Sequence, residues 1–525
     1  MFRDARSLAD GERLRAPVCV IGAGAAGITL ARDLADRGHD VLVLESGGLE
    51  YEDEVQALHE MEMTGRPFGP ADDPYPVTTT RLRYFGGTTN HWAGYCRPLR
   101  PVDLETRPGL ARSGWDLPYD ELARWYPRAT EVLGLPSDRF DPEHWAEHGH
   151  GPPLLHDDLV ETVVFQLSPV NFGTWYRDEL DRSERVTVLL HANATALRTD
   201  ESGQRVTEVE VRTLEGGRAV VEPGLVVLAM GGLENPRLLL ASNERGGIGN
   251  DHDLVGRYFC EHFQHTLGFA VVARPPEALR AYHRQTLAVD GADVTVQSAL
   301  VLSDDVVRRE GLLGLEVQLA VADLAGDDVP ATLDGPTMRD LGAVLGAASR
   351  EGPARAVVLC QVFAEQELNP DSRVHLTDEV DALGMRKAAL HWAHTDLDRR
   401  SIEAGLAVVG RALGRRGLGR LQRTLGNLVP REDGAGEGPL GRIAIDPARA
   451  TADFHLAHGN HHMCTTRMAA DPTQGVVDLD LRVHGTTNLY VAGSSTFATP
   501  GVAAPTITLV ALAARLAEHL HRELS

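Results

Sequence analysis

A glycine-rich turn near the N-terminus constrains the fold of this chain more than any other feature. Residues 17–21 are a short apolar run, typical of a buried parallel strand, and Gly22-Ala23-Gly24-Ala25-Ala26-Gly27 follows at once. Residues 28–37 have helical spacing, and residues 41–44 predict a second buried strand that ends at Glu45. The pattern predicts a strand–helix–strand unit at the start of a parallel α/β sheet.

The glycine spacing gives this unit a chemical interpretation. Glycines allow a tight turn and a close approach of the backbone, and the free N–H groups at a helix start favour a pyrophosphate. A carboxylate after the second strand can accept hydrogen bonds from a ribose. The sequence therefore predicts a dinucleotide site at Gly22, Gly24, Gly27 and Glu45. The alternative is a tight turn in a fold without a nucleotide, and the spacing does not separate flavin from nicotinamide cofactors.

Bulk properties exclude several classes of function. The 525 residues suggest about two to four domains. A formal net charge of -24 argues against nucleic acid or an anionic membrane surface as the main partner, because both need basic patches. No targeting segment is visible and no apolar run reaches the length of a membrane span. The 5 cysteines are scattered without a Cys-x-x-Cys pair, which indicates reduced thiols in a cytoplasmic protein.

The rest of the chain predicts a second layer inserted into the first. Further strands are expected at 186–190, 206–213 and 225–229, helices at 121–133 and 235–241, and loops at 50–77 and 140–160. The middle has strand-like runs at 315–320 and 357–363, a Gly- and Asp-rich stretch at 325–335, and a basic helical segment at 411–423. A buried strand at 489–493 and a helix at 506–520 close the chain.

These elements divide the chain into three segments. Residues 1–265 are interpreted as the N-terminal part of a cofactor-binding domain and 266–440 as a substrate-binding domain. Residues 441–525 return to the cofactor-binding domain and carry the run Gly459-Asn460-His461-His462. If the two ends of the chain form one active site, they must meet in space.

Residues 85–94, Phe-Gly-Gly-Thr-Thr-Asn-His-Trp-Ala-Gly, have almost no helix or strand signal. Glycines permit close packing on a flat ligand, and Thr and Asn side chains offer hydrogen bonds. A surface loop is the alternative, but Trp92 and the paired glycines favour a buried, shaped loop.

With these motifs, the chain resembles the glucose-methanol-choline (GMC) oxidoreductases, an FAD-binding family that acts mostly on alcohols and sugars. The loop around His91 is similar to that of the pyranose-oxidase branch. The resemblance covers essentially the whole chain and implies an α/β fold, in which an FAD-binding Rossmann-like domain carries an inserted antiparallel-sheet substrate domain. The matching blocks are residues 20–45, 85–94, 255–257, 370–374 and 461–516, with 488–495 as a second flavin-contacting segment.

The resemblance implies FAD as the cofactor and assigns residues to its parts. Gly22, Gly24, Gly27 and Glu45 hold the ADP half, and the backbone near Ala194 faces the adenine. Pro505 and Thr506 approach the pyrimidine edge of the flavin, where a helix start suits an anionic reduced flavin. Along the pyrophosphate and isoalloxazine lie Gly87, Thr88, Asn90 and His91, with Gly493 and Ser494 at the pyrophosphate.

His91 has two interpretations. Some family members, pyranose oxidases among them, attach FAD covalently through a histidine at this position. Others keep a similar loop without the bond, and the imidazole then packs beside the dimethylbenzene ring.

His461 matches the family's catalytic histidine. Histidine suits a proton acceptor because its ordinary pKa lies near neutrality. By the resemblance, His461 takes the proton of the substrate hydroxyl while the hydride passes from carbon to flavin N5. His462 is the competitor, and it should point elsewhere if the local chain is extended. A histidine with only a structural role is the alternative for either residue.

Two positions depart from the family pattern. Cys464 stands where glycine is usual, which can crowd the turn. Ala504 stands where an Asn or His usually hydrogen-bonds the reacting oxygen, and an alanine side chain can neither donate nor accept. Asn460, His462 or a residue of the middle domain are the candidates to replace it.

The expected reaction is oxidation of an alcohol, in a sugar, glycoside or polyhydroxylated natural product, to a carbonyl. A small-molecule substrate and oxygen or another electron acceptor are the expected partners, and the sequence does not define an oligomeric state. The alternative, suggested by Ala504, is a redox-neutral lyase, isomerase or cyclase. No metal is expected, although His144-x-x-x-His148-x-His150 and Glu261-His262-x-x-His265 superficially resemble ligand sets.

Overall fold

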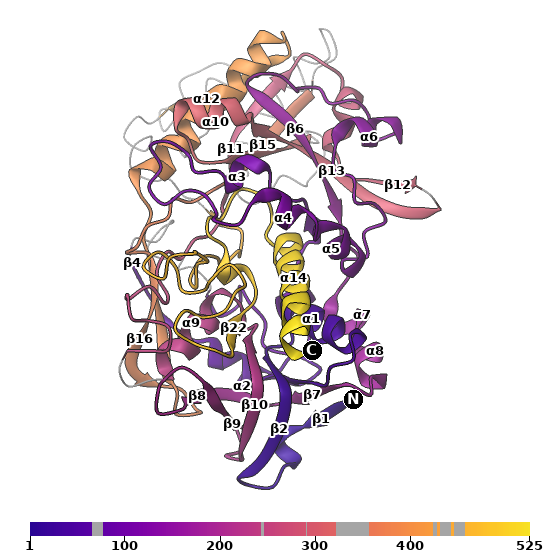
Figure 1. Ribbon diagram of the computed structural model, residues 1–525. Coiled ribbons are helices and arrows are strands. Elements are labelled where there is room, and N and C mark those ends of the chain that lie inside the picture. The colour runs from indigo at the N-terminus through magenta and orange to yellow at the C-terminus, as the bar shows by residue number, and fades with distance from the viewer. Residues whose placement is uncertain are drawn as a thin grey trace.

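The computed structural model has two layers, each built on its own sheet and hydrophobic core (Figure 1). The structure describes residues 1–65, 77–242, 246–289, 291–321, 356–423, 428–430, 443–445 and 457–525. The predicted stretch 325–335 and residues 66–76 of the predicted loop 50–77 lie outside the described residues.

The lower layer in Figure 1 is a mostly parallel sheet. Among the described residues eight strands form it, in the order β1-β7-β3-β2-β10-β9-β8, with β22 paired to β10. The pairs β10–β9 and β9–β8 are antiparallel, and the other pairs are parallel. The strands are β1 Phe2–Asp4, β2 Glu12–Ile21, β3 Val41–Leu44, β7 Val186–Leu190, β8 Asn193–Thr199, β9 Val206–Arg212, β10 Arg218–Leu228 and β22 Leu489–Val491.

Helices from both ends of the chain cover this sheet. α1 (Ala25–Asp36) and α14 (Thr506–Leu524) pack against each other, and α9 (Gly231–Ala241) follows β10 (Figure 1). The predicted strand–helix–strand unit and closing helix are therefore confirmed. Because β22 and α14 join β10 and α1, the two ends of the chain build one layer.

The upper layer is an antiparallel sheet. Its order among the described residues is β18-β11-β15-β14-β13-β6-β5, with β12 beside β13 and β21 beside β11. α12 (Asp396–Arg415) and α10 (Asp304–Glu310) lie in this layer (Figure 1). The strands are β5 Tyr95–Cys96, β6 Val160–Leu167, β11 Phe263–Val272, β12 Gln285–Val289, β13 Ala292–Leu302, β14 Leu315–Val321, β15 Ala356–Ala364, β18 Gly419–Arg423 and β21 Ala457–His458.

The predicted fold class, a Rossmann-like α/β domain with an antiparallel-sheet domain, is confirmed. The upper sheet also takes β5 and β6 from the chain before residue 266. The two layers therefore alternate along the sequence, and the limits 1–265, 266–440 and 441–525 stay a prediction.

Smaller elements complete the described structure. A three-stranded sheet joins β16 (Arg373–Val380), β17 (Arg386–Trp392) and β4 (Glu62–Gly65), and β19 (Leu428–Pro430) pairs with β20 (Ile443–Ile445). The short helices are α2 Asp53–Gln56, α3 Pro101–Leu104, α4 Tyr119–Ala123, α5 Tyr126–Val132, α6 Pro142–Glu147, α7 Phe172–Trp175 and α8 Arg177–Arg182. The 3-10 turns are Ala5–Ser7, Ala57–His59, Gly87–Asn90, Pro276–Tyr282 and Ser494–Thr496.

Four local predictions were wrong in part. The helix at 121–133 breaks into α4 and α5, because Pro127 in the first turn of α5 cannot donate the amide hydrogen bond that a continuous helix requires. The loop at 140–160 contains α6, which Asp141 caps by accepting the N–H of His144.

The other two errors have tertiary causes. Residues 411–423 divide into the end of α12 and the strand β18, which gains its hydrogen bonds from β11. The loop at 50–77 contains α2 and β4, and β4 pairs with the distant β17.

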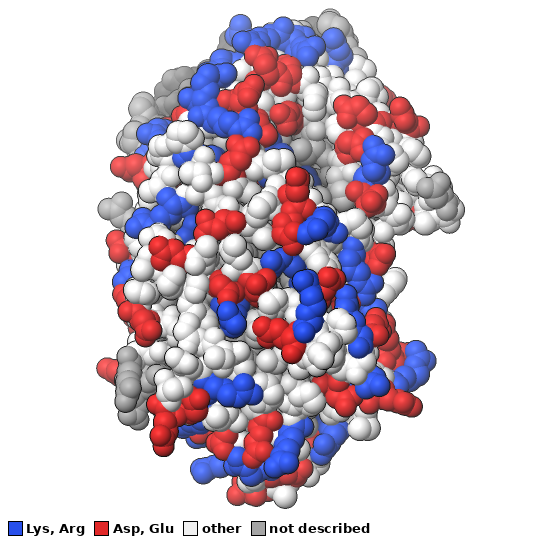
Figure 2. Space-filling model, in the orientation of Figure 1, with Lys and Arg blue, Asp and Glu red and all other residues white. Residues whose placement is uncertain are grey.

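The surface shown in Figure 2 intermixes acidic and basic side chains. Within the described part of the chain, no helix is long and apolar enough to cross a membrane.

Candidate active site

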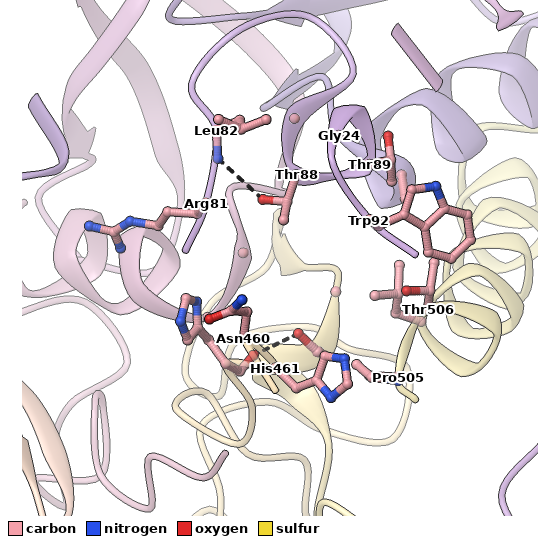
Figure 3. A pocket seen from close by; sticks show the side chains of 18 of the residues that line it. Gly24, Arg81, Leu82, Thr88, Thr89, Trp92, Asn460, His461, Pro505 and Thr506 are labelled. Carbon is pink, nitrogen blue, oxygen red and sulfur yellow. Dashed lines mark hydrogen bonds between the residues drawn. The ribbon is translucent and has the colours of Figure 1, made fainter. Parts of the chain in front are cut away.

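One cavity of about 600 Å³ extends from the turn after β2 to the segment that carries His461. Elements far apart in the sequence line it: the β2–α1 turn, the end of β3, residues 79–95, both sheets and the start of α14. Figure 3 shows Thr88 and Leu82 on one side of the cavity, with Asn460 and His461 facing them, Pro505 next to His461 and Thr506 beside Trp92. The cavity volume suits a ligand of dinucleotide size.

The β2–α1 turn is shaped by its glycines. Gly22 has φ +106°, and a Cβ there would lie 2.6 Å from the carbonyl oxygen of Ala229. Gly27 lies against the carbonyl of Gly22, so it allows α1 to pack closely on β2. Gly24 caps α1 and has open space where a Cβ would be. The turn therefore leaves room in front of the helix N-terminus, as a pyrophosphate requires.

Glu45 is 5% exposed and lies at the end of β3, on the wall of the cavity. Its carboxylate accepts the backbone N–H of Ala23 at 2.9 Å and of Gly47 at 3.1 Å, and the hydroxyl of Ser46 at 3.2 Å. These bonds hold the carboxylate beside the glycine turn. A carboxylate has about four acceptor sites, so one stays available to a ribose hydroxyl.

The loop at 85–94 packs directly on this turn. A Cβ on Gly87 would lie 3.2 Å from Cα of Gly24, so the two glycine turns touch. The indole N–H of Trp92 donates to the carbonyl of Val170 at 2.9 Å, which fixes the loop to the chain before α7. The loop is thus shaped by its contacts and partly buried, with Phe85, Gly86, Thr89 and Gly94 buried and His91 and Ala93 exposed.

Most of the predicted cofactor residues meet at this one cavity. Gly27 and Asn90 do not line it: Gly27 serves helix packing, and the amide of Asn90 donates to the carbonyl of Phe85 at 2.9 Å. Their contact with the cofactor stays a prediction, as do the roles of the others. The predicted residues on the cavity wall are Gly22, Gly24, Glu45, Gly87, Thr88, His91, Ala194, Gly493, Ser494, Pro505 and Thr506, together with His461.

His461 lines the same cavity as Glu45 but comes from the C-terminal part of the chain. Its backbone N–H donates to the carboxylate of Glu261 at 2.5 Å, and its Nδ1 lies 2.9 Å from Nδ1 of His262. Burial lowers the pKa of His461 well below its ordinary value, and His262 and His462 lower it further. His461 is therefore neutral at pH 7, which is the protonation state of a base.

Sequence reasoning missed His262, which had been considered only as a metal ligand. His262 is 1% exposed and precedes β11, and its Nε2 lies 2.9 Å from the carbonyl oxygen of Gly501. In the part of the chain that the structure describes, no three His, Cys, Asp or Glu side chains group as a metal site. No sequence pattern indicates that His262 and His461 meet, because the contact depends on the pairing of β21 with β11, two strands far apart in the sequence.

The structure describes both positions that depart from the family pattern. Ala504 does line the cavity, so no polar side chain enters from that position. Cys464 is fully buried with φ +69°, a conformation that favours glycine. His462, the competitor of His461, is 8% exposed and its ring lies 5.9 Å from that of Phe259.

The upper sheet supplies a polar wall to the same cavity. Glu316 and Gln318 of β14 and Gln264 of β11 line it, and Arg97 lies 3.2 Å from the carboxylate of Glu316. Tyr95, Phe165 and Phe363 add aromatic rings to this side. The cavity thus joins a dinucleotide cradle, a neutral histidine and a polar wall.

Comparison with protein families shows the class of enzyme to which this arrangement corresponds. Residues 17–246 match the model of FAD dependent oxidoreductases, which with the glycine turn and cavity defines the chain as an FAD-dependent oxidoreductase. Residues 369–513 match the GMC oxidoreductase model. Together the two matches make the chain an FAD-dependent oxidoreductase of the GMC type that acts on CH–OH groups.

Individual relatives are distant. The chain is 23% identical to 2-methyl-1,2-propanediol dehydrogenase of Mycolicibacterium austroafricanum, over 97% of this chain and 95% of that protein. It is 25% identical to C-glycoside 3-oxidase of Microbacterium trichothecenolyticum, over 84% and 75% respectively. Among solved structures, pyridoxine 4-oxidase from Mesorbium loti superposes with a TM-score of 0.55 at 19% identity, over 97% of this chain and 99% of that one, which supports the fold.

Proposed function

We propose that this enzyme oxidises a hydroxyl group of a sugar, glycoside or similar polyhydroxylated compound to a carbonyl. The polar wall of Glu316, Gln318 and Gln264 near His461 carries the proposal, because several amide and carboxylate groups suit a substrate with several hydroxyls. The aromatic rings of Tyr95 and Phe165 give apolar faces for the C–H faces of a sugar ring. The similarity to a C-glycoside 3-oxidase supports this substrate class.

In this proposal His461 accepts the proton of the substrate hydroxyl as the carbonyl forms. Bound FAD would supply the hydride acceptor for the same carbon. The β2–α1 turn and Glu45 hold the ADP half, and the start of α14 at Pro505 and Thr506 presents N–H groups to the flavin edge. Residues of the upper sheet line the cavity where the substrate would bind.

Anaerobic mixing tests this function. The FAD-loaded protein is mixed with a panel of sugars, glycosides and diols, and the flavin absorbance is followed. Bleaching by a polyhydroxylated compound supports the proposal. Product formation with the flavin oxidised throughout supports the redox-neutral alternative, and bleaching by simple alcohols alone contradicts the sugar assignment.

His461→Ala is expected to slow flavin reduction by about 10²- to 10⁴-fold, because positioned bases contribute that much. The rate of absorbance loss at saturating substrate measures it. His150→Ala is the matched control, since His150 is also buried but does not line the cavity. A His461→Ala enzyme that reduces its flavin at the wild-type rate removes this residue from the mechanism.

We propose that FAD can be bound covalently through His91, which a denaturing gel tests. His91 lines the cavity, and burial lowers its pKa, so its imidazole is neutral and nucleophilic. Such a bond would support the proposal of a pyranose-oxidase-like branch. Flavin fluorescence on the denatured protein band that disappears in His91→Ala supports the bond, and an unlabelled wild-type band excludes it.

We also propose a cytoplasmic location. All five cysteines are buried free thiols. Subcellular fractionation of the native host, with thiol labelling after denaturation, tests this proposal. Recovery outside the cytoplasm contradicts it.

A further inference from the structure

The side chain of His461 contacts a second histidine, His262, whereas Ala504 has no polar side chain to offer. The ring of His262 meets the ring of His461 edge to face, with centroids 5.0 Å apart and planes at 89°. Nδ1 of His262 lies 2.9 Å from Nδ1 of His461. Each ring has one proton to place when neutral, so the positions of these protons follow from the surrounding groups.

The second nitrogen of His262 sets the first proton. Nε2 of His262 lies 2.9 Å from the carbonyl oxygen of Gly501. A carbonyl oxygen can only accept, so Nε2 of His262 must carry a hydrogen. Burial lowers the pKa of His262 to about 4, so the ring is neutral and carries no second hydrogen. Nδ1 of His262 is therefore a lone-pair acceptor.

This acceptor sets the proton of His461 in turn. Two bare nitrogens at 2.9 Å would repel each other, so Nδ1 of His461 carries a hydrogen and donates it to His262. Since His461 is also neutral, its Nε2 holds a lone pair. Within the described residues Nε2 of His461 has no hydrogen-bond partner, and the residue lines the cavity.

Backbone contacts hold both rings in register. The carboxylate of Glu261 accepts the backbone N–H of His461 at 2.5 Å and of His262 at 3.0 Å. Gly501 lies three residues before Ala504, so the loop that lacks the usual polar side chain supplies a backbone carbonyl to His262 instead. The tautomer of His461 is thus fixed at its Nδ1 by His262, which also lines the cavity.

We propose that His262 is a positioning residue of this active site, which holds His461 as the Nδ1–H tautomer through the carbonyl of Gly501 and so leaves Nε2 of His461 as the free base. The inference deepens the proposed alcohol oxidation and rests on it for its catalytic meaning. It also accounts for a working base beside Ala504.

Imidazole ¹⁵N NMR tests the tautomer without any substrate. The oxidised FAD-loaded protein is labelled with ¹⁵N-histidine, and the His461 signals are assigned by their loss in His461→Gln. The wild type is expected to show a protonated Nδ1 and a bare Nε2. His262→Asn should keep this pattern, because its amide oxygen can accept near the former Nδ1, and His262→Phe should lose it. A protonated Nε2 in the wild type, or an unchanged tautomer in His262→Phe, overturns the proposal.

Flavin reduction tests the catalytic consequence. With any alcohol that bleaches the wild-type flavin, His262→Phe should lower the limiting reduction rate by about 10- to 100-fold, the usual effect of removing a group that orients a reacting one. The substrate concentration at half-maximal rate should stay near the wild-type value, and His262→Asn should recover most of the rate. A wild-type rate in His262→Phe contradicts the proposal.

His150→Phe is the matched control for the loss of a buried histidine. His150 is 1% exposed, contacts Ser298 at 3.0 Å and does not line the cavity, so its flavin reduction should match the wild type. The flavin spectrum and the thermal midpoint report folding, and the Asn variant decides the matter if His262→Phe does not fold. If no alcohol bleaches the wild type, the proposed function fails, while the NMR result still decides the role of His262.

Discussion

Cys464 has a backbone conformation that glycine usually adopts. Its φ of +69° lies in the left-handed region, where a side chain with a Cβ is strained by about 1–2 kcal/mol relative to glycine. The backbone N–H of Cys464 donates to the carbonyl of Ser494 at 3.1 Å, so the turn that follows His461 is tied to the cavity wall. The strain therefore sits close to the base.

This geometry predicts an unusual order of stability. Cys464→Gly should be more stable than Cys464→Ala by about 1 kcal/mol, because both lose the buried thiol but only glycine relieves the strained φ. Denaturant midpoints of the two FAD-loaded variants, measured side by side, give the difference. Equal midpoints, or a more stable alanine variant, would show that the turn relaxes around a Cβ.

At the same scale, the sequence predicted the glycines of the β2–α1 turn, Glu45 and His461 because each belongs to a local pattern. It did not predict His262, whose importance depends on a contact with a residue far along the chain. A side chain whose function is to orient another has no local pattern of its own. Ala504 marked the missing group, and only the fold could show that the residue before β11 contacts His461.

At the scale of elements, one buried ion pair ties the chain after α3 to the end of β15. The guanidinium of Arg107 is within 2.5 Å of the carboxylate of Glu365, with both side chains at most 3% exposed. Burial alone would raise the pKa of Glu365, but Arg107 lowers it below its ordinary value, so the carboxyl is charged. Glu365 also accepts the N–H of Gly314 at 2.6 Å.

Removing one partner should therefore be costly. Glu365→Ala leaves the Arg107 guanidinium buried and uncompensated, which typically destabilises by about 3–5 kcal/mol. Glu105→Ala is the matched control, because Glu105 pairs with Arg308 at the surface, where pairs contribute about 0–1 kcal/mol. Urea unfolding of both variants measures the free energies, and similar losses in the two would contradict the assignment.

Elements whose cause is local were predicted well, and those with a tertiary cause were not. β2, α1 and β3 follow from apolar runs and helical spacing in adjacent residues. Residues 419–423 were expected to be helical but form β18. The strand gets its hydrogen bonds from β11, and a local pattern in residues 419–423 cannot indicate that partner. β4 was not predicted either, because it pairs with the distant β17.

For the whole molecule, buried neutral histidines set the response to acid. Burial lowers the pKa of His150 and of His262 to about 4, and the pKa values of His59 and His461 lie well below 6.5. The unfolded chain therefore binds more protons than the folded one between about pH 6.5 and pH 4. Stability is present above pH 6.5 and is lost as the pH falls through this window.

Each such histidine should contribute a slope of up to about 1.4 kcal/mol per pH unit. Thermal midpoints of the FAD-loaded protein at fixed ionic strength should therefore drop from pH 7 to pH 5. His150→Gln removes one of these groups and should make the drop shallower. A midpoint independent of pH over this range is the contrary result.

The pairing of β22 with β10 and of α14 with α1 has a consequence for biosynthesis. A ribosome releases β10 and α1 long before β22, His461 and α14 leave the exit tunnel. Until then the parallel sheet has an open edge, and the turn after β2 has no opposite wall. The nascent chain can thus enclose FAD only after residues 461–524 have left the ribosome, so cofactor loading follows the synthesis of this segment.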